Sequence, residues 1–160
     1  MIDSKDREIV SILLSDASTS KAEIARRVGL AASAIAERIR RLEADGVVRG
    51  YHAEVDPTPL GKGLLAFVFV TDAKPTTGFD TAGALSDVTG LEELHKIAGD
   101  DCYLLKIRVA DTGELNSILE REISPITSVV SVRTTIVLRS IVEQVPMAHL
   151  GRVGLEGMTS

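Results

Sequence analysis

The chain has 160 residues, of which 44% are hydrophobic, and a net charge of −5 at pH 7. This length suits one large or two small domains with packed cores. A single cysteine, Cys102, excludes an intramolecular disulfide framework and fits a reducing compartment. The charged start has no apolar signal segment, and the longest apolar run, Leu64 to Val70, is too short to cross a bilayer as a helix. We therefore expect a cytoplasmic protein without a membrane partner.

The charge is unevenly distributed along the chain. Residues 1–50 contain nine Lys/Arg and eight Asp/Glu, whereas residues 51–160 contain nine and fifteen. Residues 21–49 contain seven basic and four acidic side chains. This pattern favours a DNA-binding module attached to an acidic domain with another task. It disfavours a protein that coats DNA through gross charge, because phosphate neutralisation scales with the number of cations presented.

Residues 3–14 predict a first amphipathic helix, with Ile9, Ile12 and Leu13 inward. The stretch from Thr19 to Tyr51 then predicts two more helices joined by a turn at Gly29, where a left-handed backbone suits glycine. Ser20 and Glu23 have the spacing of a capping box at the start of the second helix. The inward faces of the second and third helices are predicted to carry Ile24, Ala25, Val28, Leu30, Ile35, Ile39 and Leu42, and Gly46 ends the third.

The third helix has the cationic face expected of a helix that enters the major groove of DNA. We expect Arg38 and Arg41 to face DNA, one bidentate to a guanine edge and the other on a phosphate. The alternative is an ordinary hairpin in which they form surface salt bridges with Glu37 or Asp45. The predicted DNA-binding residues are Ser20, Ser33, Ala34, Glu37, Arg38, Arg40 and Arg41, with Arg40 to the side.

Domain boundaries follow from the residues after Gly46. Residues 47–55 predict a short extended segment, which the prolines of Asp56-Pro57-Thr58-Pro59 stop because proline cannot donate to a ladder. We assign residues 1–50 to a helix-turn-helix domain, 51–62 to an extended linker, 63–139 to a second domain and 140–160 to a tail without an assigned role.

The sequence pattern of the second domain predicts strands and helices in the order β-α-β-β-α-β. Strands are expected at about 64–71, 92–98, 103–109 and 129–138, with helices at about 80–88 and 111–123. Split β-α-β units of this order form a four-stranded antiparallel sheet with both helices on one face. The predicted fold class is therefore α+β, with a ferredoxin-like βαββαβ domain after the helix-turn-helix.

The sheet face without helices is the basis for a dimer prediction. The first strand is apolar on both faces, and the third and fourth are largely so, interrupted mainly by Lys106, Arg108, Arg133 and threonines. An exposed face of this kind would be a costly apolar patch. We expect a second copy to cover it, sheet on sheet, as a homodimer. The alternative is a helix from the tail folding back.

Five stretches carry a family resemblance: DREIVSILL, SKAEIARRVGL, AIAERIRRLEADGVVRGYHAEVDPTPLG, AGDDCYLLKIRVADTGEL and VRTTIVLR. Through them the chain resembles the Lrp/AsnC (leucine-responsive, "feast/famine") family of prokaryotic transcription regulators over nearly its whole length. The resemblance implies a winged-type helix-turn-helix and an effector domain that forms dimers and often octamers. It implies that small molecules, usually amino acids, bind between dimers and shift assembly or DNA affinity. The implied partners are double-stranded DNA, further copies of the chain and an effector, at the nucleoid and without a cofactor.

Two positions depart from the family pattern. The usual Ser or Thr that caps the recognition helix is replaced by Ala31 and Ala32, a loss of about 1 kcal/mol unless Ser33 starts the helix later. The effector turn, usually Gly-Asp-aromatic-Asp, reads GDDC at 99–102, so a ligand ammonium lacks its customary carboxylate at Cys102. Asp101 is the candidate substitute.

The effector prediction rests on this turn, whose backbone N–H groups could hold a carboxylate. A mere hairpin turn would have the same sequence, and β-propensity alone explains the threonines on the last strand equally well. The predicted effector-binding residues are Ala98, Gly99, Asp100, Asp101, Cys102, Tyr103, Thr134 and Thr135.

Two other functions remain as alternatives. An architectural protein would wrap DNA without an effector. An enzyme of the same build acting on tetrapyrroles would need histidines in the second domain, where His95 is the one candidate and is expected to be packed or at an interface. His52 and His149 have no partners at metal spacing, and a lone half-buried thiol such as Cys102 is usually inert. We predict no catalytic residue and no metal site.

Overall fold

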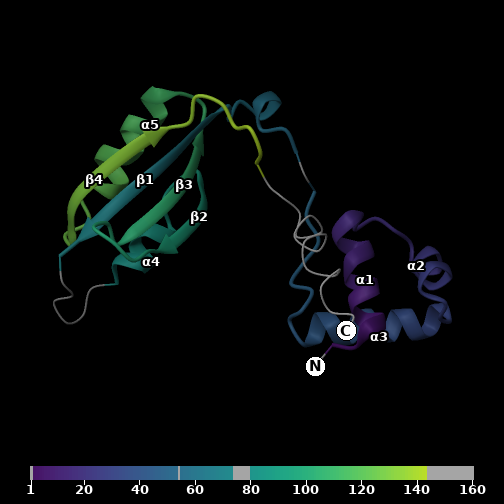
Figure 1. Cartoon of the computed structure of the whole chain (residues 1–160). Helices are drawn as coiled ribbons and strands as arrows, with labels where there is room; N and C mark the ends of the chain where they lie inside the picture. Colours follow the sequence, from purple (N-terminus) through teal and green to yellow (C-terminus); the bar gives the residue numbers. More distant parts are fainter. Residues whose placement is uncertain (1, 54, 74–79, 144–160) are drawn as a thin grey trace. The chain divides into compact units, whose positions relative to one another are not determined.

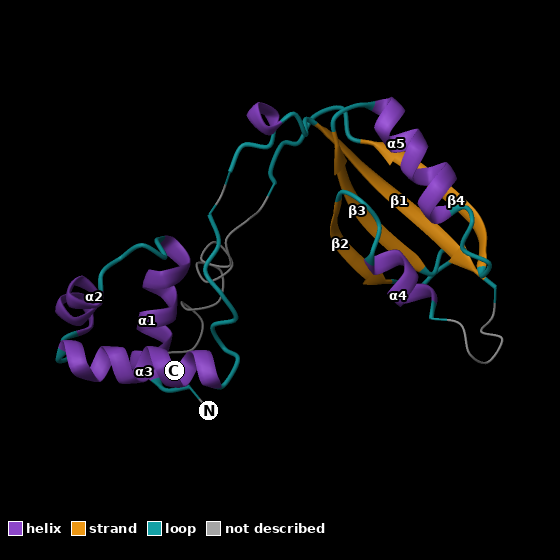
Figure 2. Cartoon of the chain, turned by 180° about the vertical axis from the view of Figure 1, so that it is seen from behind, coloured by secondary structure: helices purple, strands orange, loops and turns teal. Residues whose placement is uncertain are grey.

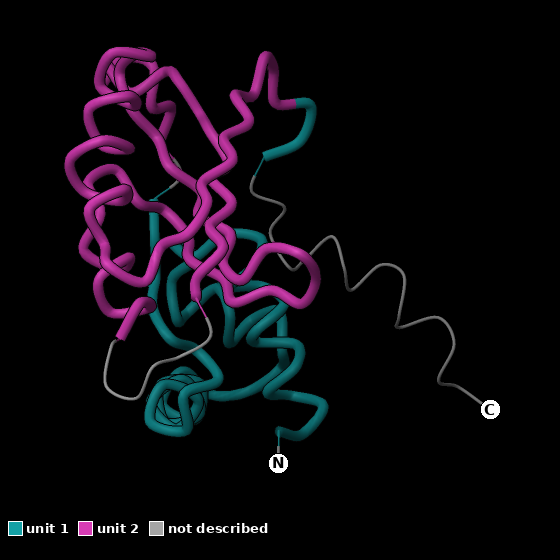
Figure 3. The backbone as a smooth tube through the Cα atoms, turned by 90° about the vertical axis from the view of Figure 1, so that its left-hand side faces the viewer, with its two compact units in different colours: residues 1–54, 141–160 teal, residues 55–140 magenta. Residues whose placement is uncertain are grey.

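The computed structural model describes residues 2–53, 55–73 and 80–143. The chain divides into two compact units, Met1–Glu54 with Ile141–Ser160, and Val55–Ser140 (Figure 3). Most of the predicted tail, including His149, lies outside the described residues. Within the described residues, no helix has the length and apolarity needed to span a membrane.

The first unit contains the three predicted helices, α1 (Ser4–Ser15), α2 (Lys21–Val28) and α3 (Ala32–Ala44) (Figure 1). Their apolar faces meet in one core, which confirms the inward rows read from the sequence, although Ile12, Leu13 and Leu30 lie at its margin. The buried residues of this core are Ile9, Ile24, Ala25, Val28, Ile35, Ile39 and Leu42.

The helix caps differ from the prediction. Ser20 accepts the Glu23 backbone N–H at 3.2 Å, but the Glu23 carboxylate binds two arginines of α2 and does not return to Ser20. The complete capping box is at α1, between Asp3 and Asp6. At α3, Ala31 occupies the N-cap without a side-chain bond. The helix therefore starts before Ser33, and no hydroxyl side chain caps it.

Glycines end both α2 and α3 in the left-handed conformation, Gly29 at φ 73° and Gly46 at φ 68°. The extended segment predicted for residues 47–55 does not begin at its first two residues, because the N–H groups of Val47 and Val48 both return to the carbonyl of Leu42. The described residues of the first unit form no strand. The predicted linker also contains a 3₁₀ turn, Thr58–Leu60.

The second unit is the predicted βαββαβ domain. Its elements are β1 Leu64–Asp72, α4 Thr81–Ser86, β2 Leu91–Lys96, β3 Tyr103–Val109, α5 Thr112–Ile118 and β4 Val129–Ile136. The four strands are antiparallel and lie in the order β2-β3-β1-β4. Figure 2 shows both helices on one face of this sheet. The helix after β3 ends in a π-helical turn, Leu119–Ile123.

The core of the second unit lies between the sheet and the two helices. Directly opposed residues on antiparallel strands share one face of a sheet. Val68 opposes Leu105, and both are fully buried beneath α5 residues such as Ile118. The even-numbered residues of β1 and the odd-numbered residues of β3 therefore face the helices, and their neighbours face the other side, called here the open face.

The open face is less apolar than the sequence suggested. β1 supplies Leu65, Phe67 and Phe69, as expected from a strand that is apolar on both sides. β4 contributes polar residues to this face, with Arg133 opposite Phe69 and Thr135 opposite Phe67. The expectation of a second apolar face is right for β1 and wrong for β4, because the alternation along β4 places its threonine and arginine outward on this side.

Charged side chains cover part of the open face. The Arg133 guanidinium lies 3.9 Å from the centroid of the Phe69 ring. Lys106, opposite Phe67, is only 8% exposed and binds the carboxylate of Glu92 at 3.1 Å. Long basic side chains lay their aliphatic stems along apolar surface and keep the charge outside. The open face therefore has an apolar row along β1, flanked by charged side chains of β3 and β4.

Candidate nucleic-acid interface

α3 presents a polar face on the side opposite its inward row. At roughly 100° per residue, Ser33, Glu37 and Arg40 lie opposite the row formed by Ile35 and Ile39. All three polar residues are exposed. The surface formed by Ser33, Ala34, Glu37, Arg40 and Arg41 is called here the α3 outer face.

Arg40, expected to the side of the DNA-facing residues, is exposed next to Glu37 on the α3 outer face. Its side chain is 70% exposed and binds the Glu37 carboxylate through Nε at 3.0 Å and Nη2 at 2.6 Å. The hydrogen bonds from Arg40 lower the pKa of Glu37. Exposed ion pairs one helical turn apart add little stability, so Arg40 can exchange Glu37 for a phosphate or a base edge at small cost.

Arg38 occupies a different position from the one expected. Its Nη1 donates to Asp3 at 2.6 Å and to Asp6 at 2.7 Å, and its side chain is only 26% exposed. In this geometry Arg38 is directed toward α1 and not toward the polar face of α3, and its ion-pair partners are Asp3 and Asp6, not Glu37 or Asp45, the partners considered as the alternative. The physical reason is the helix period, which places Arg38 three residues from Ile35, beside the core and against α1.

Arg41 is intermediate in exposure between Arg38 and Arg40. Its Nη2 donates to Asp6 at 2.7 Å, while half of its side chain, 51%, is exposed at the edge of the α3 outer face. Asp6 is 1% exposed. Burial raises the pKa of this carboxyl, but hydrogen bonds from Arg38 and from the Asp3 backbone, with the charge of Arg41, outweigh burial and lower it.

The acids of α1 were missed by sequence reasoning. A signal was present, since Asp3 and Asp6 have capping-box spacing immediately before an amphipathic helix. That spacing predicts a helix start and says nothing about the two arginines, which lie 32 to 35 positions further along the chain.

α2 adds a second set of exposed cations that the sequence reading passed over. Arg26 and Arg27 both bind the Glu23 carboxylate, with a shortest N–O distance of 2.7 Å for each. Hydrogen bonds from Arg26 and then Arg27 lower the pKa of Glu23 to about 2. Arg26 is 75% exposed. Ser20, predicted to contact DNA, is the exposed N-cap of the same helix.

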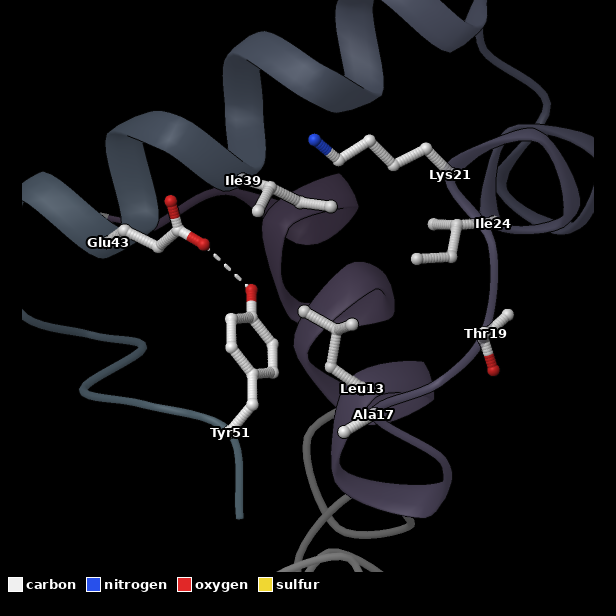
Figure 4. Close-up of a pocket in the computed structure, with 8 residues that line it drawn as sticks. All are labelled: Leu13, Ala17, Thr19, Lys21, Ile24, Ile39, Glu43 and Tyr51. Carbon is white, nitrogen blue, oxygen red and sulfur yellow. Dashed lines mark hydrogen bonds between the residues drawn. The ribbon is translucent and has the colours of Figure 1, made fainter. Parts of the chain in front are cut away.

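A shallow pocket of about 250 Å³ lies in the first unit, beside the core (Figure 4). Tyr51 closes one side of it and donates from its hydroxyl to Glu43 at 2.8 Å. Burial, and then the bond to Glu43, raise the pKa of Tyr51. None of the residues of the α3 outer face lines this pocket, so it is separate from the candidate interface. Its lining is Leu13, Ala17, Thr19, Lys21, Ile24, Ile39, Glu43 and Tyr51.

The predicted effector turn forms between β2 and β3. The Cys102 N–H bonds to the carbonyl of Val70, and the Ile97 N–H bonds to the carbonyl of Cys102, both at 2.9 Å. Gly99 adopts φ 143°, a conformation suited to glycine. Asp101, the candidate partner for a ligand ammonium, receives Arg133 Nη2 at 2.6 Å. Its carboxylate is therefore already neutralised within the chain.

The structure keeps residues 98–102 in one turn but does not bring all the predicted effector residues to one face of the sheet. Tyr103 is 6% exposed and faces the helices, with the Lys96 ammonium 5.8 Å from its ring centroid. Thr134 opposes Val68 on the helix side, whereas Thr135 opposes Phe67 on the open face. A single ligand cannot use both threonine side chains, because consecutive strand residues point to opposite faces. Ala98, Gly99 and Asp100 are exposed in the turn, and Cys102 is half-buried with a free thiol.

His95, expected to be packed or at an interface, is 54% exposed in the single chain and lies 3.0 Å from the Glu93 carboxylate. Among the described residues, no three His, Cys, Asp or Glu side chains gather closely enough to hold a metal ion. The described part of the second unit thus offers ion pairs and a turn.

Both units match known protein families. Residues 2–49 match the winged helix-turn-helix DNA-binding model, and residues 65–147 match the Lrp/AsnC ligand binding domain. The chain is 37% identical over 139 residues to the HTH-type transcriptional regulator LrpA of Mycobacterium tuberculosis, covering 87% of this chain and 91% of that protein. It is 33% identical over 142 residues to the leucine-responsive regulatory protein of Escherichia coli K12, covering 88% and 87%.

Solved structures of Lrp/AsnC-type regulators also resemble this chain. A feast or famine regulatory protein from M. tuberculosis, complexed with L-methionine, superposes with a TM-score of 0.83 at 36% identity, covering 89% of this chain and 96% of that one. The M. tuberculosis leucine response regulatory protein superposes with a TM-score of 0.79 at 34% identity and the same coverage. The similarity therefore extends over both units.

Proposed function

The chain belongs to the Lrp/AsnC family of DNA-binding transcriptional regulators, and we propose that an amino acid bound where its dimers meet sets its assembly or its affinity for DNA. The observation that carries the DNA-binding part is the α3 outer face, on which Ser33, Glu37 and Arg40 are exposed. The relatives are named transcriptional regulators, so the proposal includes no catalytic reaction.

In the proposed complex, α3 lies in the major groove. Ser33 and Ala34 are close to the start of the helix, where recognition helices contact base edges. Arg40 leaves Glu37 for a guanine or a phosphate, and the cations of α2 add phosphate contacts. Two copies would place two recognition helices in successive major grooves, about 34–36 Å apart.

The open face supports dimer formation. Phe67, Phe69 and Leu104 form an apolar cluster on it, which Lys106 of β3 and Arg133 of β4 flank with their ion-pair partners. An apolar centre with a polar rim is typical of a protein–protein interface. We propose that two sheets meet across this face and that the dimers assemble further, as octamers.

The effector part of the proposal draws on the match of the second unit to a ligand-binding domain and on the relative solved with L-methionine. A ligand shifts an equilibrium only by its differential affinity for the two states, so the amino acid must bind one assembly better than another. The turn at residues 98–102 is the proposed contact for its carboxylate. Because Arg133 holds Asp101, we expect the ligand's ammonium to find its partner elsewhere.

Selection and titration test this proposal. The full-length protein is used to select duplexes from a randomised library, and its affinity for the best duplex is then measured with each of the twenty amino acids. The melting temperature and the sedimentation coefficient are followed in parallel, since a ligand of the native state raises the melting temperature. We expect at least one amino acid to change affinity or assembly size.

Two outcomes contradict the proposal in different ways. If a duplex is selected but no amino acid changes melting, affinity or size, the architectural function without an effector is favoured. If no duplex is selected, the DNA-binding role of α3 fails. A change in absorbance on adding a tetrapyrrole would instead favour the enzymatic alternative.

A further inference from the structure

A single buried carboxylate connects the first turn of α1 to two arginines of α3. Asp6 is 1% exposed and receives Arg38 Nη1 through Oδ1 and Arg41 Nη2 through Oδ2, both at 2.7 Å. The Asp3 backbone N–H also donates to Oδ2, at 3.1 Å. Each carboxylate oxygen therefore holds an arginine from the helix that carries the candidate DNA interface.

We propose that Asp6 is a positioning residue for DNA binding, which holds the guanidinium of Arg41 at the edge of the α3 outer face, ready for a phosphate. This inference rests on the DNA-binding role of α3. Asp6 itself is too deeply buried to touch DNA, so it acts through Arg41.

The two arginines bound to Asp6 have different roles. Arg38 also binds Asp3 and is 26% exposed, which makes it a link between α1 and α3. Arg41 bonds to Asp6 through Nη2 alone and keeps 51% of its side chain in solvent. A guanidinium has five N–H donors in a fixed plane, so one can be anchored while others face a phosphate.

Anchoring lowers the entropy that binding must remove. A free arginine samples many rotamers and loses them when it meets DNA, whereas a tethered one has lost most of them on folding. Arg40, whose partner Glu37 is 65% exposed on the same helix, lacks such a buried anchor. The bond to Asp6 thus makes Arg41 a preordered phosphate contact, whereas Arg40 is a mobile one.

Charge alone and positioning predict opposite effects on DNA affinity when Asp6 is neutralised, so the direction of the change tests the proposal. A carboxylate near the interface repels phosphate, so replacing Asp6 by a neutral residue should tighten DNA binding if charge alone counts. If Asp6 acts by positioning Arg41, the same replacement should weaken binding. Asp6→Asn keeps the size of the side chain and one carbonyl oxygen for the Asp3 N–H.

The matched control is Asp3→Asn, which removes the same charge from the same cluster. Asp3 is 50% exposed and binds Arg38 but not Arg41, and asparagine is as good an N-cap as aspartate. Full-length wild type and variants are titrated with a duplex selected by the wild type, over a range of salt concentrations. We expect Asp6→Asn to weaken binding about tenfold relative to Asp3→Asn. It should also lower the slope of log affinity against log salt by about 0.9, the loss of one phosphate contact.

A double-mutant cycle isolates the route through Arg41. Arg41→Ala alone should weaken binding, and adding Asp6→Asn to it should change affinity no more than Asp3→Asn does in that background. The inference is overturned if Asp6→Asn binds as tightly as Asp3→Asn, or if its effect is undiminished when Arg41 is absent. If the wild type selects no duplex, the DNA-binding function has failed and not the positioning.

A second measurement avoids the variants, in case Asp6→Asn does not fold. Side-chain ¹⁵N spectra of the free wild-type protein report how freely each guanidinium rotates. We expect the Arg41 guanidinium to rotate more slowly than that of the exposed Arg7 on α1. Equal, fast averaging of the two in the free protein would overturn the inference, because Arg41 would not be preordered.

Discussion

Arg40 binds Glu37 through two hydrogen bonds, of 3.0 and 2.6 Å, on the face of α3 that points away from the helical core. Arg38, two residues earlier, points to the other side and is held by Asp3 and Asp6. The two arginines therefore separate the functions of the helix, one available to DNA and one committed to the fold.

The first prediction concerns Arg40. Arg40→Ala should weaken binding to a selected duplex about tenfold and lower the slope of log affinity against log salt by about 0.9, the loss of one phosphate contact. Filter binding or fluorescence anisotropy at several salt concentrations measures both. Arg7→Ala on α1 removes the same charge outside the α3 outer face and should leave the slope nearly unchanged. An equal effect of the two variants would argue for charge alone.

The second prediction concerns Arg38. Arg38→Met keeps the aliphatic stem but leaves the buried Asp6 carboxylate with one cation in place of two. Loss of a partner from a buried charge is destabilising, so the melting temperature of the first unit should fall more than in Arg40→Met. Calorimetry or circular dichroism provides the measurement. Equal melting temperatures for the two variants would show that the link to α1 contributes nothing.

The third prediction is a loss of stability in acid. The pKa of Glu23 is about 2 in the folded chain, against 4.5 for the ordinary group, and the pKa values of Asp3, Asp6 and Glu37 are also lowered. A group whose pKa is lower in the folded state binds fewer protons there, so its stabilisation is present above the unfolded pKa and lost as pH falls through the folded one.

The free energy of unfolding of the first unit should therefore decrease as pH falls from about 4.5 to 2. Urea titrations across this range measure it. Glu23→Gln should reduce the dependence, since glutamine does not titrate. Added salt should reduce the contribution of Glu23, whose side chain is 31% exposed, more than that of buried Asp6. A free energy that stays flat from pH 5 to 2 would contradict the assigned ion pairs.

The fourth prediction concerns the open face. Phe67→Asp places a charge between Lys106 and Thr135, at the centre of the proposed dimer contact. We expect sedimentation to show dissociation to monomers, with weaker DNA binding because two linked recognition helices no longer act together. Asn116→Asp on the exposed side of α5 is the control and should remain assembled. A dimer that survives Phe67→Asp would place the contact elsewhere.

Local pattern was enough to predict most of the fold. The spacing of Ile35, Ile39 and Leu42 identified the inward side of α3, because a helix has a fixed period. The order of helices and β-branched runs in the second unit predicted a βαββαβ sheet, which the topology confirms. Both properties depend on residues close together in the chain.

Assignment of the side chains to a site needed contacts that sequence distance conceals. The partners of Arg38 lie 32 and 35 residues away, and the partner of Asp101 lies 32 residues away. Charge alone could pair these groups with many others, so local pattern could not choose among them.

The amino-acid sequence by itself determined which segments are helices and strands, since periodicity and capping act over a few residues. Tertiary structure alone decided that α1 holds Arg38 and that Thr134 and Thr135 serve opposite faces of the sheet. Those outcomes depend on where packing places one element against another, and packing is a property of the whole folded unit.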